Sequence, residues 1–403
     1  MKRVIFHVDV NSAFLSWEAC YRIHHLGGKQ DLRKMVSAVG GDQEKRHGII
    51  LAKSIPAKKF HIQTGETVVS AKEKCPDLTL VPPNYDLYNK SSKALIKLLS
   101  EYTDKIEQYS IDEAFLDMTG CCDDSERTAH EIKDRVHAQL GFTVNIGVSE
   151  NKLLAKMASD FMKPDRVHTL WKSEIQTKMW PLPVSELFYV GHASLNKLRK
   201  LGIHTIGELA ATDPGILQAH MKSQGLLIWQ YANGIDETAV IDTPPPAKGY
   251  GNSLTTPQDV TEPGIAKQYL LSLSETIGAR LRADSVKIGV VSISLRDWDL
   301  RFYGHQITLS VPTDLTMEIY HAACQCLSEL WDGIPLRHLG IHTNRVTTDQ
   351  FRQMQLFDTV DYEKAKTMEK TVDRIRKKYG MDSIKRACFL PSAESMEMDL
   401  MAG

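Results

Sequence analysis

Three acidic residues in the first third of the chain could act together. Asp9 ends the apolar run "KRVIFHVDV", and Asp112 and Glu113 stand side by side in "EQYSIDEAFLDMT". Carboxylates that meet repel one another, and hard divalent cations with oxygen ligands relieve that repulsion best. Two such ions can hold an attacking and a leaving oxygen in line across a phosphate. The trio predicts metal-assisted chemistry at a phosphate. The alternative is that two surface acids lie on a turn and that Asp9 is an N-cap-like residue.

Basic residues are available to neutralise such a phosphate. Lys58 and Lys59 in "PAKKF" and Lys163 in "MKPD" are compact cations that could face a triphosphate. Lysines on surface helices are usually only solvated, so they support the acidic trio without proving it. The sequence has no GxxxxGK[ST] loop, which excludes the commonest phosphate cradle. The segment "VDVNSA" resembles an Asp-x-Asp phosphatase motif, but Asn11 stands where the second Asp belongs.

The elements around the acids must bring them together. "KRVIFHVDV" predicts a buried strand, and "SAFLSWEACYRI" a helix with Ser12 as a possible N-cap. Two further strands are expected at about 106–110 and 114–118, with the acidic pair at the tip of their hairpin. Neighbouring side chains on a regular strand face opposite ways, so the pair is predicted to lie in the turn.

The remaining elements of this half complete a layer. Residues 85–104 predict an amphipathic helix, and "HEIKDRVHAQLG" and "ENKLLAKMASDFMKP" two more helices around the strand "FTVNIGVS". The order strand, helix, hairpin, helix, strand favours a ferredoxin-like α/β fold.

Short helices dominate from about residue 172, and "YVGHASLNKLRKLGIHTIGELA" pairs two of them around "LGI" as in a helix-hairpin-helix. The Pro-rich segment 242–249 predicts a stiff domain boundary. The order helix, strand, strand, helix, strand beyond it predicts a second α/β sandwich, followed by one charged helix. The expected class is therefore an α+β protein of several domains.

Composition bounds the class of protein. The 403 residues are 42% hydrophobic and 25% charged with a net charge of −1, so overall charge does not indicate a nucleic-acid binder. The seven cysteines form no CxxC pair, which argues against a disulfide framework and a zinc finger. No apolar stretch reaches the roughly 18 residues of a membrane span, and the N-terminus is a poor signal peptide. We expect a cytoplasmic protein without a membrane partner.

Four motifs in this order and spacing resemble the Y-family lesion-bypass DNA polymerases. They are "HVDVNSAF", "AKSIPAKKFHI", "YSIDEAFLD" and "NKLLAKMASDFMKPD", and the match is closest to the bacterial polymerase IV/polymerase V branch. The resemblance implies a ferredoxin-like palm at 1–14 and 75–170, fingers at 15–74 and a helical thumb at 171–240. A linker at 241–249, a little-finger domain at 250–347 and a tail at 348–403 would follow.

The resemblance also implies site residues. Asp9 and Asp112 would hold two Mg²⁺ ions with help from the Val10 carbonyl, and Glu113 would hold the ion that activates the primer 3′-hydroxyl. Phe14 would be the steric gate against a ribonucleotide 2′-hydroxyl, although it could equally be a core aromatic. Ser12, Lys58 and Lys163 would contact the incoming dNTP. Many relatives have Arg at position 58, Tyr at 55 and Tyr or Cys at 12, so these phosphate contacts differ from the usual pattern.

Partners follow from the same resemblance. The thumb hairpin would hold primer-template DNA by its backbone, although "VGHAS" replaces the usual Gly-x-Gly turn and simple helix packing is an equal alternative. The little-finger domain is less basic than expected, so DNA affinity should be modest and salt-sensitive. "QMQLF", with Gln353, Leu356 and Phe357, resembles the peptide by which bacterial polymerases dock on the β sliding clamp. A chance match, or packing on the chain's own surface, is the alternative. We expect a monomer.

The function so predicted is template-directed DNA polymerisation of the translesion type, in DNA repair, SOS-associated damage tolerance and mutagenesis. One alternative is a nucleotidyl cyclase with a similar acidic palm, which would not need the thumb, the second sandwich or the clamp peptide. Another is a DNA-binding accessory protein that has lost catalysis, against which the intact acidic trio argues.

Overall fold

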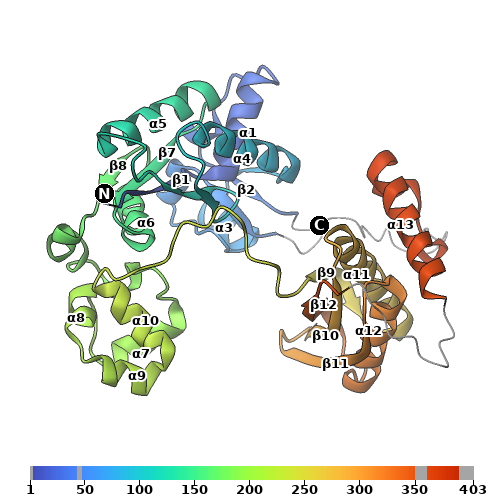
Figure 1. The fold of residues 1–403 in the computed structure, drawn as a ribbon. Helices are drawn as coiled ribbons and strands as arrows, with labels where there is room; N and C mark the ends of the chain where they lie inside the picture. Colours follow the sequence, from blue (N-terminus) through green and yellow to red (C-terminus); the bar gives the residue numbers. More distant parts are fainter. Residues whose placement is uncertain (1–2, 43–47, 350–360, 390–403) are drawn as a thin grey trace. The chain divides into compact units, whose positions relative to one another are not determined.

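The computed structural model describes residues 3–42, 48–349 and 361–389. The chain divides between Pro244 and Pro245 into two compact units, each with its own core (Figure 1). This division falls inside the predicted linker. Within the described residues, none of the helices combines the length and apolar character needed to span a bilayer. All seven cysteines are free thiols.

A five-stranded sheet forms the centre of the first unit, in the order β5-β6-β1-β7-β8. All neighbouring strands are antiparallel except β7 and β8. The strands are β1 (Ile5–Val10), β5 (Ile106–Gln108), β6 (Glu113–Asp117), β7 (Val144–Ser149) and β8 (Val167–Thr169). The predicted ferredoxin-like layer is thus confirmed, with β8 as an added edge strand.

The two faces of this sheet are covered by different helices. Phe6, Val8 and Val10 of β1 share a core with the buried faces of α4 (Tyr85–Leu99) and α5 (Ser125–Leu140), and α1 (Ala13–His24) packs beside α4. The alternate residues of β1 face α6 (Lys152–Asp160) on the other side. A side chain at Gly147 would place its Cβ 1.9 Å from the Ala155 carbonyl oxygen, so the glycine permits the close approach of α6 to β7.

Smaller layers flank the sheet. Strands β2 (Ser37–Gly40), β3 (Ile50–Lys53) and β4 (Thr79–Val81) form a three-stranded sheet in the order β3-β2-β4, packed with α2 (Ile55–Lys58) and α3 (Val68–Lys74). The helices that follow the five-stranded sheet share a separate core with α6. They are α7 (His192–Lys200), α8 (Ile206–Ala211), α9 (Pro214–Met221) and α10 (Ser223–Ala232).

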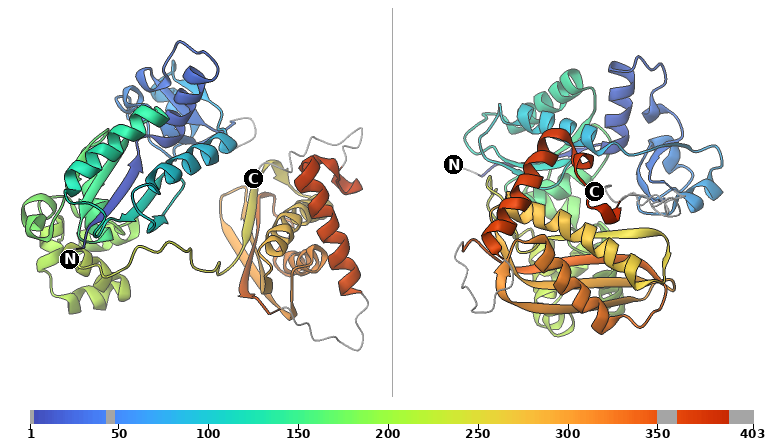
Figure 2. Two further views of the ribbon diagram at one scale, coloured as in Figure 1. Left: turned by 45° about the horizontal axis from the view of Figure 1, so that its top comes forward. Right: turned by 90° about the vertical axis from the view of Figure 1, so that its right-hand side faces the viewer.

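The second unit is a four-stranded antiparallel sheet in the order β11-β10-β12-β9, with two helices packed against it (Figure 2). Its strands are β9 (Gly251–Val260), β10 (Lys287–Asp297), β11 (Phe302–Thr313) and β12 (Leu336–Thr347), and its helices α11 (Pro263–Ala283) and α12 (Thr316–Leu330). A further helix, α13 (Tyr362–Tyr379), lies against α11.

Some sequence-based expectations were wrong in detail. Helix α4 ends at Leu99 and not near residue 104, and Glu113 is the first residue of β6 and not a turn residue. Ser12 precedes α1 but makes no side-chain cap hydrogen bond, because its backbone is left-handed with φ 48°. Strand β9 and the sheet formed by β2, β3 and β4 were not predicted as such.

Candidate active site

The register of the central sheet places two of the acids opposite each other. Asp9 on β1 pairs with Glu113 on β6, so both side chains leave the same face of the sheet. Asp9 is the last residue but one of β1, which runs into α1, and Glu113 is the first residue of β6, where the β5–β6 turn ends. The antiparallel pairing therefore brings together residues more than one hundred positions apart.

Asp112 is positioned by the turn that precedes β6. Ser110 donates its hydroxyl to Asp112 Oδ1 at 2.7 Å and accepts from the backbone N–H of Asp112 and Glu113 at 3.3 and 3.1 Å. The carbonyl oxygen of Asp112 accepts from the Val10 N–H at 3.1 Å. Because these hydrogen bonds stabilise the turn internally and join it to β1, they hold the carboxylate of Asp112 beside Asp9.

Asp9 is a buried carboxylate held by a lysine. Lys163 Nζ donates to Asp9 Oδ2 and also pairs with Asp160 at 2.7 Å. Burial raises the pKa of Asp9 to about 6; Lys163 opposes this rise, and the nearby Glu113 and Asp112 add to it. The carboxylates raise the pKa of Lys163 to about 12 in spite of burial. The site thus carries an excess of negative charge that one lysine only partly offsets.

Glu113 has a lysine of its own. Lys156 Nζ, on α6, lies 2.8 Å from Glu113 Oε2, and the buried His7 Nε2 lies 3.6 Å from the same oxygen. Burial alone raises the pKa of Glu113, but His7 and Lys156 outweigh it and lower the pKa to about 2. Burial also lowers the pKa of His7 to about 4, so the imidazole is neutral at pH 7. Lys156 is therefore the counter-charge of Glu113.

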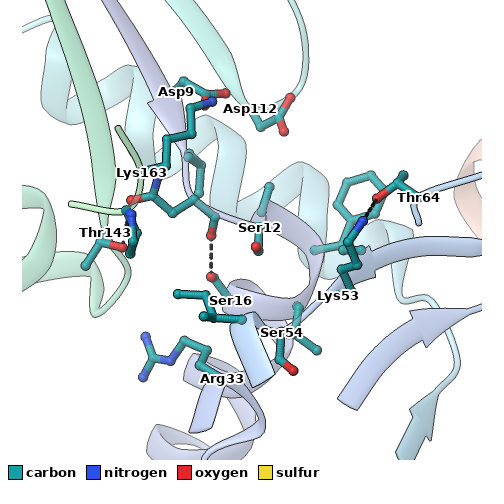
Figure 3. A pocket seen from close by; sticks show the side chains of 18 of the residues that line it. Asp9, Ser12, Ser16, Arg33, Lys53, Ser54, Thr64, Asp112, Thr143 and Lys163 are labelled. Atoms are coloured by element: carbon teal, nitrogen blue, oxygen red, sulfur yellow. Dashed lines mark hydrogen bonds and ion pairs between the residues drawn. The ribbon is translucent and has the colours of Figure 1, made fainter. Parts of the chain in front are cut away.

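A cavity of about 620 Å³ opens beside these acids (Figure 3). Asp9, Val10, Ser12, Asp112 and Lys163 line it, whereas Glu113 is not among its lining residues. Lys53, Ser54 and Lys58 of the β3–α2 segment also line it, and Figure 3 shows Lys53 across the cavity from Lys163. The structure thus brings seven of the eight predicted palm and fingers residues to one cavity, the seventh being Phe14.

Several lining residues were missed by the sequence analysis. Lys53, at the end of β3, lies 3.4 Å from Thr64 Oγ1, and burial together with the nearby Lys58 lowers its pKa. Arg33 also lines the cavity and donates to the Gly141 carbonyl at 2.8 Å. Only the folding of the small sheet onto the start of α1 brings these cations to the cavity, so no local motif could have revealed them. Lys156, the partner of Glu113, could have been recognised in the sequence, since it interrupts the apolar run "LLAKMA".

Phe14 forms part of an aromatic stack in the cavity wall. Its ring lies parallel to that of Tyr88, with centroids 4.4 Å apart and an interplanar angle of 7°. Tyr88 is fully buried and donates its hydroxyl to Glu18 at 3.1 Å. The ring of Phe14 is therefore a supported surface with one side available to the cavity, and it is not enclosed in the core.

The donor chemistry of this site fits a hard divalent cation. Asp9, Asp112 and Glu113 offer oxygen atoms only, and burial together with the other two acids raises the pKa of Asp9, so a cation bound there would favour its charged form. The two lysines now supply cationic groups at the carboxylates. In the part of the chain that the structure describes, no three His, Cys, Asp or Glu side chains are grouped so as to hold a metal ion.

The predicted clamp peptide cannot be placed on this structure. Gln353, Leu356 and Phe357 lie outside the described residues. The predicted thumb hairpin corresponds to α7 and α8, which Gly202, with φ +73°, separates.

Comparisons with known proteins agree on one family. Residues 8–160 match the impB/mucB/samB family and residues 247–356 match the impB/mucB/samB family C-terminal domain. The chain is 43% identical over 396 residues to DNA polymerase IV of Clostridium acetobutylicum, covering 98% of this chain and 100% of that protein. It is 35% identical to DNA polymerase IV 1 of Bacillus subtilis, over 98% and 94% of the two chains.

The fold has a solved counterpart. A Y-family DNA polymerase chimera superimposes with a TM-score of 0.74 at 20% identity, covering 86% of this chain and 100% of that one. The Y-family architecture predicted from the motifs is thereby confirmed.

The buried Asp9 makes stability depend on pH. Because its folded pKa, about 6, lies above the ordinary 3.8, the native state loses stability as pH rises from about 4 to about 6. Asn does not titrate, so Asp9→Asn should gain stability relative to the parent protein by up to about 3 kcal/mol over this range. Urea unfolding of both proteins at about pH 4 and pH 7.5, without divalent cations, measures this difference. Asp104→Asn, at an exposed site, is the control, and an equal Asp9→Asn difference at both pH values would contradict the assignment.

Proposed function

Since the chain belongs to the impB/mucB/samB family of Y-family DNA polymerases, we propose that its cavity binds a dNTP and transfers the nucleotide to a primer end. The chain is a translesion-type DNA-directed DNA polymerase, a nucleotidyltransferase that acts in DNA damage tolerance. The observation that supports the site assignment is a single cavity lined by Asp9 and Asp112 together with Lys53, Lys58 and Lys163.

We assign metal binding to the three acids. Y-family polymerases are metal-dependent nucleotidyltransferases, and we assign two Mg²⁺ ions to Asp9, Asp112 and Glu113 with the Val10 carbonyl. Bound there, the ions would lower the pKa of the primer 3′-hydroxyl and offset charge on the leaving pyrophosphate. Lys163 and Lys156 each engage one oxygen of Asp9 and Glu113, so full coordination by both oxygens would require these ion pairs to open.

Lys163, which pairs with Asp9, is also assigned a role in nucleotide binding. Once released, Lys163 remains at the cavity wall and can neutralise the triphosphate, as can Lys58, which lines the same cavity. Ser12 can donate its hydroxyl to a phosphate oxygen, because its side chain is not used to cap α1. The same lysine thus stabilises the empty site and the bound nucleotide.

The remaining assignments extend the family architecture. We propose a palm at 1–14 and 75–170, fingers at 15–74, a thumb at 171–240 and a little finger at 250–347, joined by the linker 241–249. Primer-template DNA is the macromolecular substrate, and the protein acts as a monomer in the cytoplasm. Neither a cyclase nor an accessory protein is favoured, because the relatives that match over the full length are polymerases.

Loss of a single acid tests the catalytic assignment. Asp112→Ala should lower primer extension by at least about 1,000-fold, because the cavity loses a carboxylate that no neighbour can replace. Binding of primed DNA should be retained. Extension with Mg²⁺ and dNTPs, together with fluorescence anisotropy on the same DNA, measures both. Asp104→Ala is the exposed control, and normal extension by Asp112→Ala would reject the site.

Sugar selection tests the role of Phe14. Because its ring faces the cavity on the support of Tyr88, Phe14→Ala should raise the kcat/KM for a ribonucleotide relative to its deoxynucleotide by about 10–100-fold. Phe14→Tyr keeps the bulk and should keep discrimination, and Phe60→Ala removes an exposed ring outside the cavity. Unaltered discrimination in Phe14→Ala would show that the ring is only a packing element.

A clamp-docking peptide is proposed at Gln353–Phe357. Leu356→Ala with Phe357→Ala should abolish stimulation of synthesis by a loaded β clamp, because the peptide would lose its apolar anchors. Synthesis without clamp should be unchanged. Phe351→Ala lies outside the five-residue match and is the control. Full clamp stimulation of the double variant would refute the proposal.

A further inference from the structure

We propose that the outward face of α13 binds the phosphate backbone of duplex DNA, as a contact additional to the polymerase site. The inference rests on the proposed function, since it assumes that DNA is the substrate. It starts from an electrostatic contrast within the second unit. Residues 250–347 carry eight Lys and Arg against ten Asp and Glu, a net charge of −2, whereas α13 alone carries seven against three, a net charge of +4.

Two of the three acids of α13 contact the rest of the second unit. Glu369 is buried and accepts from the backbone N–H of Thr316 at 3.1 Å, so it occupies the N-terminus of α12, whose own N-cap residue makes no side-chain bond. Arg282 of α11 donates to Glu369 and, at 2.6 Å, to Asp373. Two of the three acids of the helix therefore face the unit and are already neutralised.

Two cations of α13 also point inward. Arg376 is buried and pairs with Glu275 of α11 at 3.1 Å, and Lys366 pairs with Asp314 at 3.4 Å. Together with the acids, these pairs fix which side of the helix contacts the unit. The rotation of α13 about its axis is thus determined by charge more than by apolar packing.

Four of the five remaining cations form one exposed face, and the fifth, Lys364, lies in the first turn of the helix. Lys370, Arg374, Lys377 and Lys378 are exposed and follow the spacing i, i+4, i+7, i+8, which places them on one side of a helix. None of the four has an ion-pair partner among the residues that the structure describes. Favourable interaction with the helix dipole accounts for cations in the last turn, but not for Lys370, two turns earlier.

A polyanion is the ligand that such a face fits. Lys and Arg at successive turns can follow a row of phosphates without reading sequence, which suits a polymerase that must bind any template. Figures 1 and 2 show α13 on the helical side of the second unit, away from its sheet. The face is therefore separate from the surface of the sheet, and it supplies the positive charge that residues 250–347 lack.

The salt dependence of binding tests this face. The variant Lys370→Gln, Arg374→Gln, Lys377→Gln should bind a long primed duplex more weakly, and the slope of log K against log salt should fall by about 2–3 between about 50 and 200 mM salt. The matched control is Lys90→Gln, Lys93→Gln, Lys97→Gln, with three exposed lysines at similar spacing on α4 of the first unit. Replacement of Lys370 and Lys377 by Arg should preserve the slope.

Extension at saturating DNA separates this inference from the polymerase assignment. The triple variant should extend primers at the parent rate once the DNA is saturating. If its slope equals that of the parent protein, the face is a solvated surface or takes an acidic protein, and the inference is overturned. If the parent protein binds with the expected slope but never extends, the polymerase assignment fails and the DNA contact stands.

Discussion

Burial of the Asp9 carboxylate beside two other acids is the constraint on which the active unit depends. Asp9, Asp112 and Glu113 converge at one end of the central sheet, where burial makes the charge of Asp9 costly, whereas His7 and Lys156 favour the charged form of Glu113. Lys156 in the middle of α6 pairs with Glu113, and Lys163 just beyond the end of this helix pairs with Asp9. The chain thus supplies a cation of its own to each of these two carboxylates.

That constraint also explains the local architecture. Asp9 and Glu113 must be in register, so β1 and β6 are paired directly, and the turn before β6 is fixed by Ser110. Asn11, where a second acid might have stood, joins the structural framework: its amide accepts from Thr143 and from the Asp165 N–H. Asn11, directly after β1, thus links the sheet to the loop that carries Lys163 without adding another negative charge beside Asp9.

The sequence predicted most of what is local and little of what is tertiary. The acids, Lys163 and the ferredoxin-like order could be read from short motifs and periodicity. Glu113 was assigned to the turn because its neighbour Asp112 is there, and only the pairing with Asp9 shows that it begins the strand. Strand β9 was missed because "GNSLTTPQDV" lacks apolar alternation, as suits an edge strand bonded only to β12. Lys53 and Arg33 reach the cavity through tertiary packing, for which the sequence carries no local sign.

Charge is divided differently in the two units, and this bears on how the protein can work. In the first unit, metal binding at Asp9 would, on the proposed assignment, release Lys163 at the wall of the cavity where the triphosphate would lie. In the second unit, Arg282, Glu369 and Asp373 form an ion-pair network that holds α13 against α11 and the start of α12. Ion pairs of the first kind would exchange during each catalytic cycle, whereas those of the second kind fix the orientation of a surface helix. The near-neutral net charge of the whole chain thus hides two different roles of its Lys, Arg, Asp and Glu side chains in the two units.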